Sequence, residues 1–180
     1  MIQKSYLGFF LSVVCIVMVA VSCKSSTSAD VGVALGAIEA NVDGNSWKAS
    51  GATAVKNTAN IGGSSVTAVT AVGAKILNQS SGDSETMEVT IYSSPNADNV
   101  SEGSYDVEDD GVPGAQFSFT SFVNGSQVSY FASSGTVKVT SISDDNVKGT
   151  FSGTVTNVND SNDTKEISGG EFNVSIGFSF

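Results

Sequence analysis

Acidic side chains alternate along one short stretch of the sequence, and carboxylates in this arrangement can bind a calcium ion. Asp106, Glu108 and Asp110 occupy every second position before Gly111, which resembles the start of a calcium-binding loop built from hard oxygen ligands. The glutamate that ends an EF-hand loop is replaced here by Phe117, and no helical pattern flanks the stretch. Two interpretations stay open: a calcium loop and, more simply, a solvated turn of the kind that Asp and Gly favour.

Aromatic side chains offer a second chemistry, because an exposed ring can stack against a sugar. The candidates are Trp47, Tyr92, Tyr105 and Tyr130, which would serve a carbohydrate or small-ligand receptor. An aromatic ring also buries a large apolar area, so the competing interpretation is that these residues fill the core. For the single tryptophan of a small β-domain, we favour the core.

The chain is short of the groups that catalysis requires. It contains no histidine, so neither a Ser-His-Asp nor a Cys-His arrangement can be built, and zinc, which favours His and Cys ligands, is not expected. A carboxylate pair for glycoside hydrolysis can be drawn from the 18 acidic residues, but the sequence does not set their separation. We therefore predict a protein that is not an enzyme and needs no cofactor, and keep a hydrolase as a less favoured alternative.

The N-terminal segment has the pattern of an export signal that ends in a lipid attachment site. Lys4 precedes an apolar run from Leu7 to Val21, which is shorter than the about 20 residues of a membrane-spanning helix and fits the hydrophobic region of a signal peptide. Residues 20–23, Ala-Val-Ser-Cys, then resemble a bacterial lipobox, although Ala20 stands where Leu is usual. The sequence predicts a signal peptide over residues 1–22 and diacylglycerol and acyl groups on Cys23, which would hold the chain firmly on a membrane.

The residues around this cysteine bear on the location of the protein. Cys23 could instead be an ordinary thiol, and Cys15 is a poorer lipid acceptor because the bulky Val14 precedes it. Lys24, in place of an aspartate beside the anchor, is compatible with outer-membrane delivery under the sorting rule of enteric bacteria. We expect a protein of the cell envelope, anchored to the outer membrane, with the periplasmic and surface faces both open.

The remaining residues suit one acidic domain. Removing residues 1–22 leaves 180 − 22 = 158 residues, enough for a substantial core. This part keeps seven of the eight lysines and all 18 acidic residues, so its formal charge is 7 − 18 = −11. The excess of acid opposes binding to phosphate backbones, and we expect no nucleic acid partner. Residues 24–35 are small and polar, which predicts a flexible lipidated tether over residues 23–35; a first edge strand around residues 31–35 is the alternative.

From residue 36 to residue 180 the pattern changes to short alternating runs separated by Gly, Asn, Asp and Ser. This pattern is typical of antiparallel β-structure. Asn124-Gly125 predicts a hairpin with a type I′ turn that places Phe119 opposite Tyr130, and Asp43-Gly44 predicts another. The sequence therefore predicts a single all-β domain over residues 36–180, a β-sandwich or barrel of about nine or ten strands.

Residues 51–77 form the least clear part of this domain, because they are almost uniformly small or β-branched. Val66, Ala68 and Val72 would share one apolar face, whereas Val69 and Ala71 argue that both faces are covered. The Thr, Val and Gly content favours a sheet over a helix with either interpretation.

Two stretches resemble motifs of a known family, the single-domain Bacteroidota lipoproteins of unknown function. Residues 43–49, DGNSWKA, are similar to an early hairpin of that family, and residues 134–151, SGTVKVTSISDDNVKGTF, are similar to its C-terminal third. Ser134, Ser143 and Lys148 depart from the family pattern. The resemblance implies a compact β-sandwich or barrel exported on a lipid anchor, with no agreed activity and no functional residues to carry over.

These patterns together predict a lipid-anchored cell-envelope β-domain with a non-enzymatic binding or structural role. Its expected partners are a membrane, through the anchor, and a glycan or an envelope protein. The alternative is a carbohydrate or small-ligand binding lipoprotein. Less favoured are a hydrolase and an integral outer-membrane barrel, in which strands of alternating character end in a final Phe, as they do at Phe180.

Overall fold

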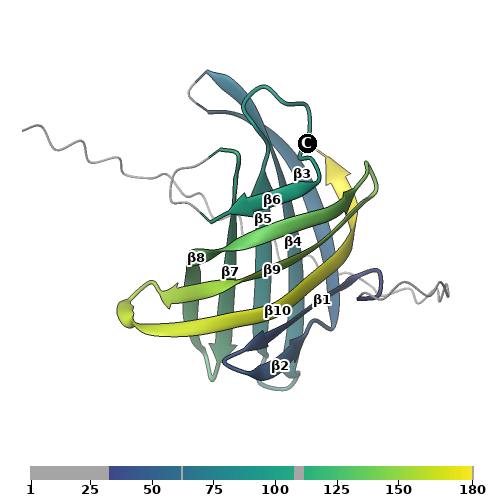
Figure 1. The fold of residues 1–180 in the computed structure, drawn as a ribbon. Coiled ribbons are helices and arrows are strands. Elements are labelled where there is room, and N and C mark those ends of the chain that lie inside the picture. The colour runs from purple at the N-terminus through teal and green to yellow at the C-terminus, as the bar shows by residue number, and fades with distance from the viewer. Residues whose placement is uncertain (1–32, 62, 108–111, 180) are drawn as a thin grey trace, which may run out of the picture.

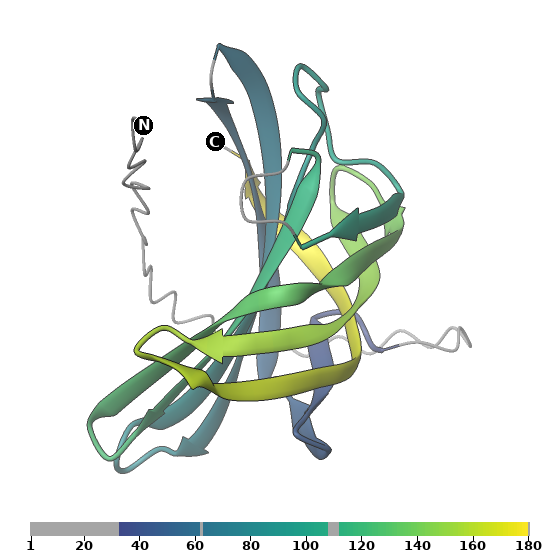
Figure 2. The ribbon, with the colours of Figure 1, turned by 60° about the vertical axis from the view of Figure 1, so that its left-hand side comes forward.

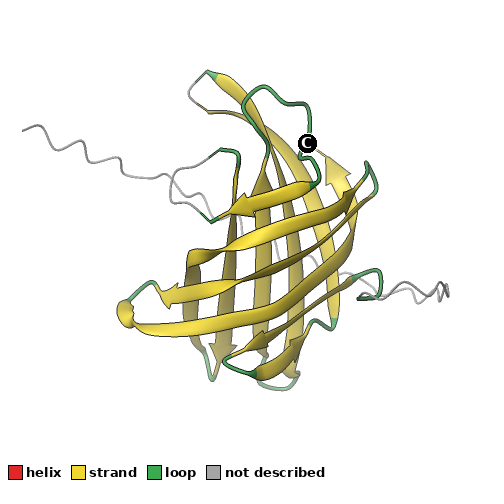
Figure 3. Ribbon diagram, in the orientation of Figure 1, coloured by secondary structure: helices red, strands yellow, loops and turns green. Residues whose placement is uncertain are grey.

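The described part of the chain consists of β-strands joined by turns. The computed structural model describes residues 33–61, 63–107 and 112–179. Figure 3 shows strands and loops, and no helix, in this part. The ten strands are β1 (Ala37–Val42), β2 (Asn45–Lys48), β3 (Gly51–Ile61), β4 (Ser64–Asn78), β5 (Asp83–Tyr92), β6 (Gly103–Asp106), β7 (Gly114–Val123), β8 (Ser126–Ile142), β9 (Asn146–Asn157) and β10 (Asp160–Ser179). The prediction of an all-β domain with about nine or ten strands is confirmed.

Several predicted features fall outside the described residues. They are the signal peptide over residues 1–22, the lipid attachment site at Cys23 and the tether up to residue 32. Within the described ranges, no helix has the length and apolar character needed to span a membrane.

The strand pairs close into a ring. β3, β4, β5, β7, β8, β9 and β10 pair in that order, and β10 pairs back with β3. Among the described strand pairs only β10–β3 is parallel, with Ile176 opposite Ala54. β1 lies along β10, β2 along β1 and β6 along β8. The outermost strands β2 and β6 have four residues each, and such short edges limit unwanted pairing with other chains.

The ring is flattened into two layers whose strands cross. Figure 1 shows β8, β9 and β10 in front of β3, β4, β5 and β7, and Figure 2 shows the front strands curving round toward the other layer. The long strand β8 joins the layers, because its residues 126–131 pair with β7 and its later residues pair with β9 and β6. β10 joins them a second time by pairing with β9 and, near its end, with β3.

Glycines permit the sharp bend at the corner between β8 and β9. Gly135 lies opposite Gly153, and their φ angles of 145° and 155° belong to backbone conformations that side chains disfavour. A Cβ atom on Gly153 would lie 2.1 Å from the carbonyl oxygen of Ser134. No larger residue fits at this position without moving one of the two strands.

Two other glycines make room for aromatic rings in the interior. On the paired strands β9 and β10, Phe172 lies opposite Gly149, and Phe151 lies opposite Gly170. Each ring occupies the space beside a glycine, since an added Cβ would lie 2.5 Å from the Phe172 ring and 2.8 Å from the Phe151 ring. The ring centroids of Phe151 and Phe172 are 6.3 Å apart, and Phe117 extends the cluster at 5.7 Å from Phe151. This cross-strand arrangement of aromatic residues over glycines is a known way to pin register.

The space between the layers is packed with apolar side chains. The largest fully buried side chains among the described residues are Phe117, Phe172, Ile38, Met87, Ile91, Ile167, Val66, Val69, Val89, Val137, Val139 and Val147. They come from both layers, so burial of apolar area holds the layers together. Val69 and Ala71 are fully buried, and Ala68 and Val72 are half-buried. Val66, on the same face as Ala68 and Val72, is also buried, so β4 is covered on both faces at its start and turns Val69 and Ala71 into the core.

The start of the described chain is fastened to β10. The backbone N–H of Val33 donates to Glu171 Oε2 over 3.3 Å, and Asn173 Nδ2 donates to the Val33 carbonyl oxygen over 3.0 Å. The Gly36 N–H also donates to the Asn173 carbonyl oxygen over 2.7 Å. Residues 33–35 of the predicted tether therefore lie against β10, and β1 begins at Ala37.

Candidate functional site

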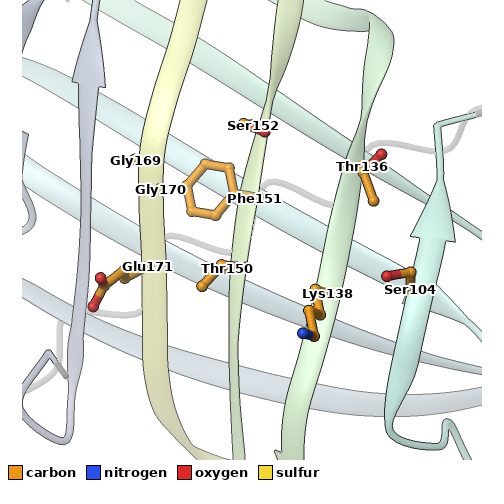
Figure 4. Close-up of a pocket in the computed structure, with 9 residues that line it drawn as sticks. All are labelled: Ser104, Thr136, Lys138, Thr150, Phe151, Ser152, Gly169, Gly170 and Glu171. Carbon is orange, nitrogen blue, oxygen red and sulfur yellow. The ribbon is translucent and has the colours of Figure 1, made fainter. Parts of the chain in front are cut away.

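The outer face of β6, β8, β9 and β10 contains a shallow hollow of about 290 Å³. Figure 4 shows the residues around it, which come from four neighbouring strands. The residues that line it are Ser104, Thr136, Lys138, Thr150, Phe151, Ser152, Gly169, Gly170 and Glu171. Most are polar, which distinguishes this face from the filled interior on the other side of the same strands.

The register of the sheet aligns these residues in two rows. In the first row Ser104 lies opposite Lys138, Lys138 opposite Thr150, and Thr150 opposite Glu171. This row crosses all four strands. In the second row Asp106, Thr136 and Ser152 lie side by side on β6, β8 and β9. Because side chains alternate between the two faces of a strand, both rows point outward, while Tyr105, Val137 and Phe151 between them point to the core.

The hollow lies beside two successive glycines of β10, of which Gly169 is exposed, while the Cβ position of Gly170 faces the Phe151 ring in the core. Gly169 and Gly170 lie where the register of β10 against β9 shifts, between Ile167 and Gly170. Gly169 has a φ of 56°, which glycine adopts without strain. Beneath them lies Phe151, which contributes the floor of the hollow although it is only 2% exposed.

Several polar groups in the hollow have no partner among the residues that the structure describes. The Thr136 hydroxyl donates to Asp106 Oδ1 over 3.3 Å, and Glu171 Oε2 accepts the Val33 N–H. Four other polar groups, on Ser104, Lys138, Thr150 and Ser152, form no side-chain hydrogen bond or ion pair with the described residues. These groups are satisfied by solvent and can therefore exchange water for a ligand.

The hollow presents charged and hydrogen-bonding groups. Its lining offers one ammonium group, one carboxylate and hydroxyl groups that both donate and accept hydrogen bonds. The Asp106 carboxylate lies beside it, within hydrogen-bond reach of the Thr136 hydroxyl. The two charged groups of the lining lie in one row with Thr150 between them.

The aromatic residues proposed for ligand stacking lie elsewhere. Trp47, Tyr105 and Tyr130 are 2%, 7% and 6% exposed and belong to the core, which is the interpretation that the sequence favours for Trp47. Tyr92 is half-buried at the end of β5. Burial, followed by repulsion from Glu88, raises the pKa of the Tyr92 hydroxyl, and burial also raises the pKa of Glu88 itself. The structure does not bring the four rings together around one site.

The Tyr105 hydroxyl fastens a loop, and the Tyr130 hydroxyl is bonded to strand β10. The Tyr105 hydroxyl donates to the Ser101 carbonyl oxygen over 2.7 Å and accepts the Ser101 N–H over 3.1 Å. The Tyr130 hydroxyl donates to Asp163 Oδ2 over 2.9 Å, while Lys165 Nζ lies 5.0 Å from the centre of the Tyr130 ring. Both tyrosines thus combine a buried ring with a hydrogen-bonded tip.

The acid beside Tyr130 belongs to a small polar cluster. Asn157 Nδ2 and the Tyr130 hydroxyl both donate to Asp163 Oδ2, over 2.8 Å and 2.9 Å. These two hydrogen bonds lower the pKa of Asp163 because they stabilise its charged form. Lys165 connects the cluster to the β1–β2 turn through an ion pair with Asp43 of 3.2 Å. The cluster joins strands to one another and leaves no described group pointing into a cavity.

The predicted calcium ligands are only partly described. Asp106 is exposed at the end of β6 and accepts the Thr136 hydroxyl. Glu108 and Asp110 lie outside the described residues. In the part of the chain that the structure describes, no group of three or more acidic, His or Cys side chains is arranged to hold a metal ion.

Sequence reasoning did not find the hollow. Its hydroxyl groups alternate with the apolar residues of β8 and β9, so they read only as the exposed face of a sheet. The one local signal is the pair Gly169-Gly170 within an otherwise regular strand, because glycine inside a strand marks a bulge or a close approach.

Comparisons of the whole chain with protein-family models, curated proteins and solved structures give no match.

Proposed function

We propose that this chain is a lipid-anchored cell-envelope protein whose β-domain binds a ligand without catalysis. The observation that carries the binding role is the hollow on β6, β8, β9 and β10, where polar groups without a partner among the described residues surround a floor that includes Phe151. The proposal of a lipid anchor rests on Cys23 and the segment before it. The absence of histidine from the sequence supports a role without acid–base catalysis.

The attachment of the chain beside the hollow fits an anchored binding protein. Val33 is hydrogen-bonded to Glu171, which lines the hollow. Cys23 and Val33 are 33 − 23 = 10 positions apart in the sequence. A fully extended chain of this length reaches about 35 Å at most. A lipid on Cys23 would therefore keep the hollow within about 35 Å of the membrane surface, near envelope ligands.

Membrane fractionation tests the anchor. Cells that express the chain are divided into soluble and membrane fractions, and the protein is weighed by mass spectrometry with and without globomycin, which blocks cleavage of lipoprotein signals. We expect membrane association and a fatty-acylated N-terminus, both lost in Cys23→Ala. Cys15→Ala is the matched control, because its cysteine lies within the segment that is removed, and it should behave as the unaltered chain does.

Two results would contradict the proposal. One is a purified protein that still carries Met1, which would mean that the segment is not removed. The other is equal membrane association of Cys23→Ala and the unaltered chain. Protease treatment of intact cells then assigns the face: digestion of the β-domain indicates the surface, and protection indicates the periplasmic side.

A further inference from the structure

We propose that the hollow binds a neutral sugar chain, with Lys138 and Glu171 holding its two ends and the hydroxyl groups between them holding the middle. This inference rests on the binding role proposed above and names its ligand. The argument uses the charges of the hollow, its free hydrogen-bonding groups and the rigidity of the strands that carry them.

The charges of the hollow are balanced and separated. Lys138 and Glu171 lie two strands apart in one row, so their Cα atoms are separated by about 10 Å, from two strand spacings of about 4.8 Å. Lys138 forms no ion pair with the described residues. One oxygen of Glu171 accepts the Val33 N–H, which leaves the other for a ligand. A donor at one end and an acceptor at the other suit a ligand with no net charge.

The hydroxyl groups between these ends narrow the ligand further. Thr150 lies directly between Lys138 and Glu171, and Ser152 lies beside it on β9. A hydroxyl group both donates and accepts, and so does each hydroxyl of a sugar. An apolar ligand would leave these groups unpaired, which costs free energy. A phosphate-rich ligand would meet the carboxylate of Glu171 and the formal charge of −10 of the chain.

The hollow is already shaped for a flat ligand. Its polar residues on β8 and β9 stand on strands that are paired with neighbours on both sides, β8 between β6 and β9 and β9 between β8 and β10. The backbone is thus held before binding, and the short Ser and Thr side chains lose little rotamer freedom on contact. Gly169 is exposed and carries no side chain, so a ligand can approach the backbone of β10 there (Figure 4).

Titration of the purified full chain in detergent with defined trisaccharides tests the proposal. The probes are neutral cellotriose and maltotriose, anionic trigalacturonic acid and cationic triglucosamine. Binding is measured by calorimetry, and the site is located by amide NMR shifts. We expect saturable binding of at least one neutral trisaccharide, with the largest shifts on β8, β9 and β10 around Thr150 and Gly170.

Variants then test the residues. Lys138→Met should raise the Kd at least about tenfold, because it removes a charged hydrogen-bond donor, and Thr150→Leu should also weaken binding by filling the centre of the hollow. Lys75→Met is the matched control: Lys75 forms an ion pair with Glu85 across β4 and β5, which contribute no residue to the hollow. The fluorescence of Trp47, which is the only tryptophan and is buried, verifies that each variant is folded.

Three outcomes overturn the inference. They are no saturable binding of either neutral trisaccharide, binding confined to the charged trisaccharides, and a Kd that Lys138→Met and Thr150→Leu leave unchanged. A failure of the proposed anchor is a separate result, because it is measured by fractionation and N-terminal mass with no sugar present. A chain that is acylated on Cys23 yet binds no trisaccharide would refute the ligand and retain the anchor.

Discussion

Replacing Gly149 by alanine tests whether the aromatic rings of the core depend on glycines in the facing strand. Gly149 lies between Val139 of β8 and Phe172 of β10. A Cβ atom there would lie 2.3 Å from the Lys138 carbonyl oxygen and 2.5 Å from Phe172 Cζ. Its φ angle is not positive, so the substitution changes packing without forcing the backbone into a conformation that alanine disfavours.

The expected cost follows from the contacts. Overpacking a well-packed site costs about 1–3 kcal/mol, and the upper value applies because the carbonyl oxygen of Lys138 is backbone and cannot rotate away. Alanine also reduces the freedom of the unfolded chain, which contributes about 0.4–1 kcal/mol in the opposite direction. The net loss is about 2 kcal/mol, which corresponds to about 1 M in the urea midpoint for an m-value of about 2 kcal/mol/M.

Gly51→Ala is the matched control, because Gly51 also lies in a strand and has no atom within 4 Å of an added Cβ. Its stability should equal that of the unaltered chain or exceed it by up to about 1 kcal/mol. Urea unfolding followed by the fluorescence of Trp47 measures both. If Gly149→Ala unfolds at the same urea concentration as Gly51→Ala, the rings are not held by the glycines and the reasoning is wrong.

Three further predictions concern polar groups. Asp163→Ala should lower the urea midpoint at neutral pH by removing the acceptor of the Tyr130 hydroxyl. Because the pKa of Asp163 is lowered, the stabilisation by its carboxylate is present above the ordinary carboxyl value of 3.8 and is lost as the pH falls through the folded-state pKa. If the midpoints of the two proteins stay equally far apart down to the most acid measurable pH, this account is contradicted. Glu88→Gln should raise the midpoint at neutral pH, since desolvation raises the pKa of Glu88 and disfavours its charge. The advantage should shrink as the pH falls through the raised folded-state pKa and should be absent below the ordinary value of 4.5; a lower midpoint at pH 7 would exclude it. Tyr105→Phe should cost about 1 kcal/mol by removing the bonds to Ser101, and hydrogen exchange of the Ser101 amide should become faster; unchanged exchange would show that the hydroxyl does not hold the loop.

Local turn chemistry is what made part of the fold predictable. Asn124-Gly125 has φ angles of 52° and 77°, and Phe119 lies opposite Tyr130, as the predicted type I′ hairpin requires. Asp43-Gly44, with φ angles of 50° and 76°, likewise joins β1 to β2. Such turns depend on two residues that accept positive φ, so neighbours in the sequence are enough to indicate them.

The closure of the ring depends on contacts that no local pattern contains. The parallel pairing of β10 with β3 places Ile176 opposite Ala54. The alternation of apolar and polar residues within a strand does not determine which other strand it pairs with. The hollow was missed for the same reason, because Ser104, Lys138 and Glu171 meet only through the pairing of four strands. The aromatic residues were ambiguous because burial of a ring is decided by the strands on either side of it.

The position of β10 in the order of the strands affects how the chain is made. β10 pairs with β1, β3 and β9, and Ala37 meets Asn173 only after a further 173 − 37 = 136 residues. At about 5–20 residues per second, a ribosome needs about 7 to 27 s to produce that interval. During this time β1 and β3 can pair with β2 and β4 but lack β10 as a neighbour, so the ring stays open, and accessible to chaperones or an export receptor, until β10 is made.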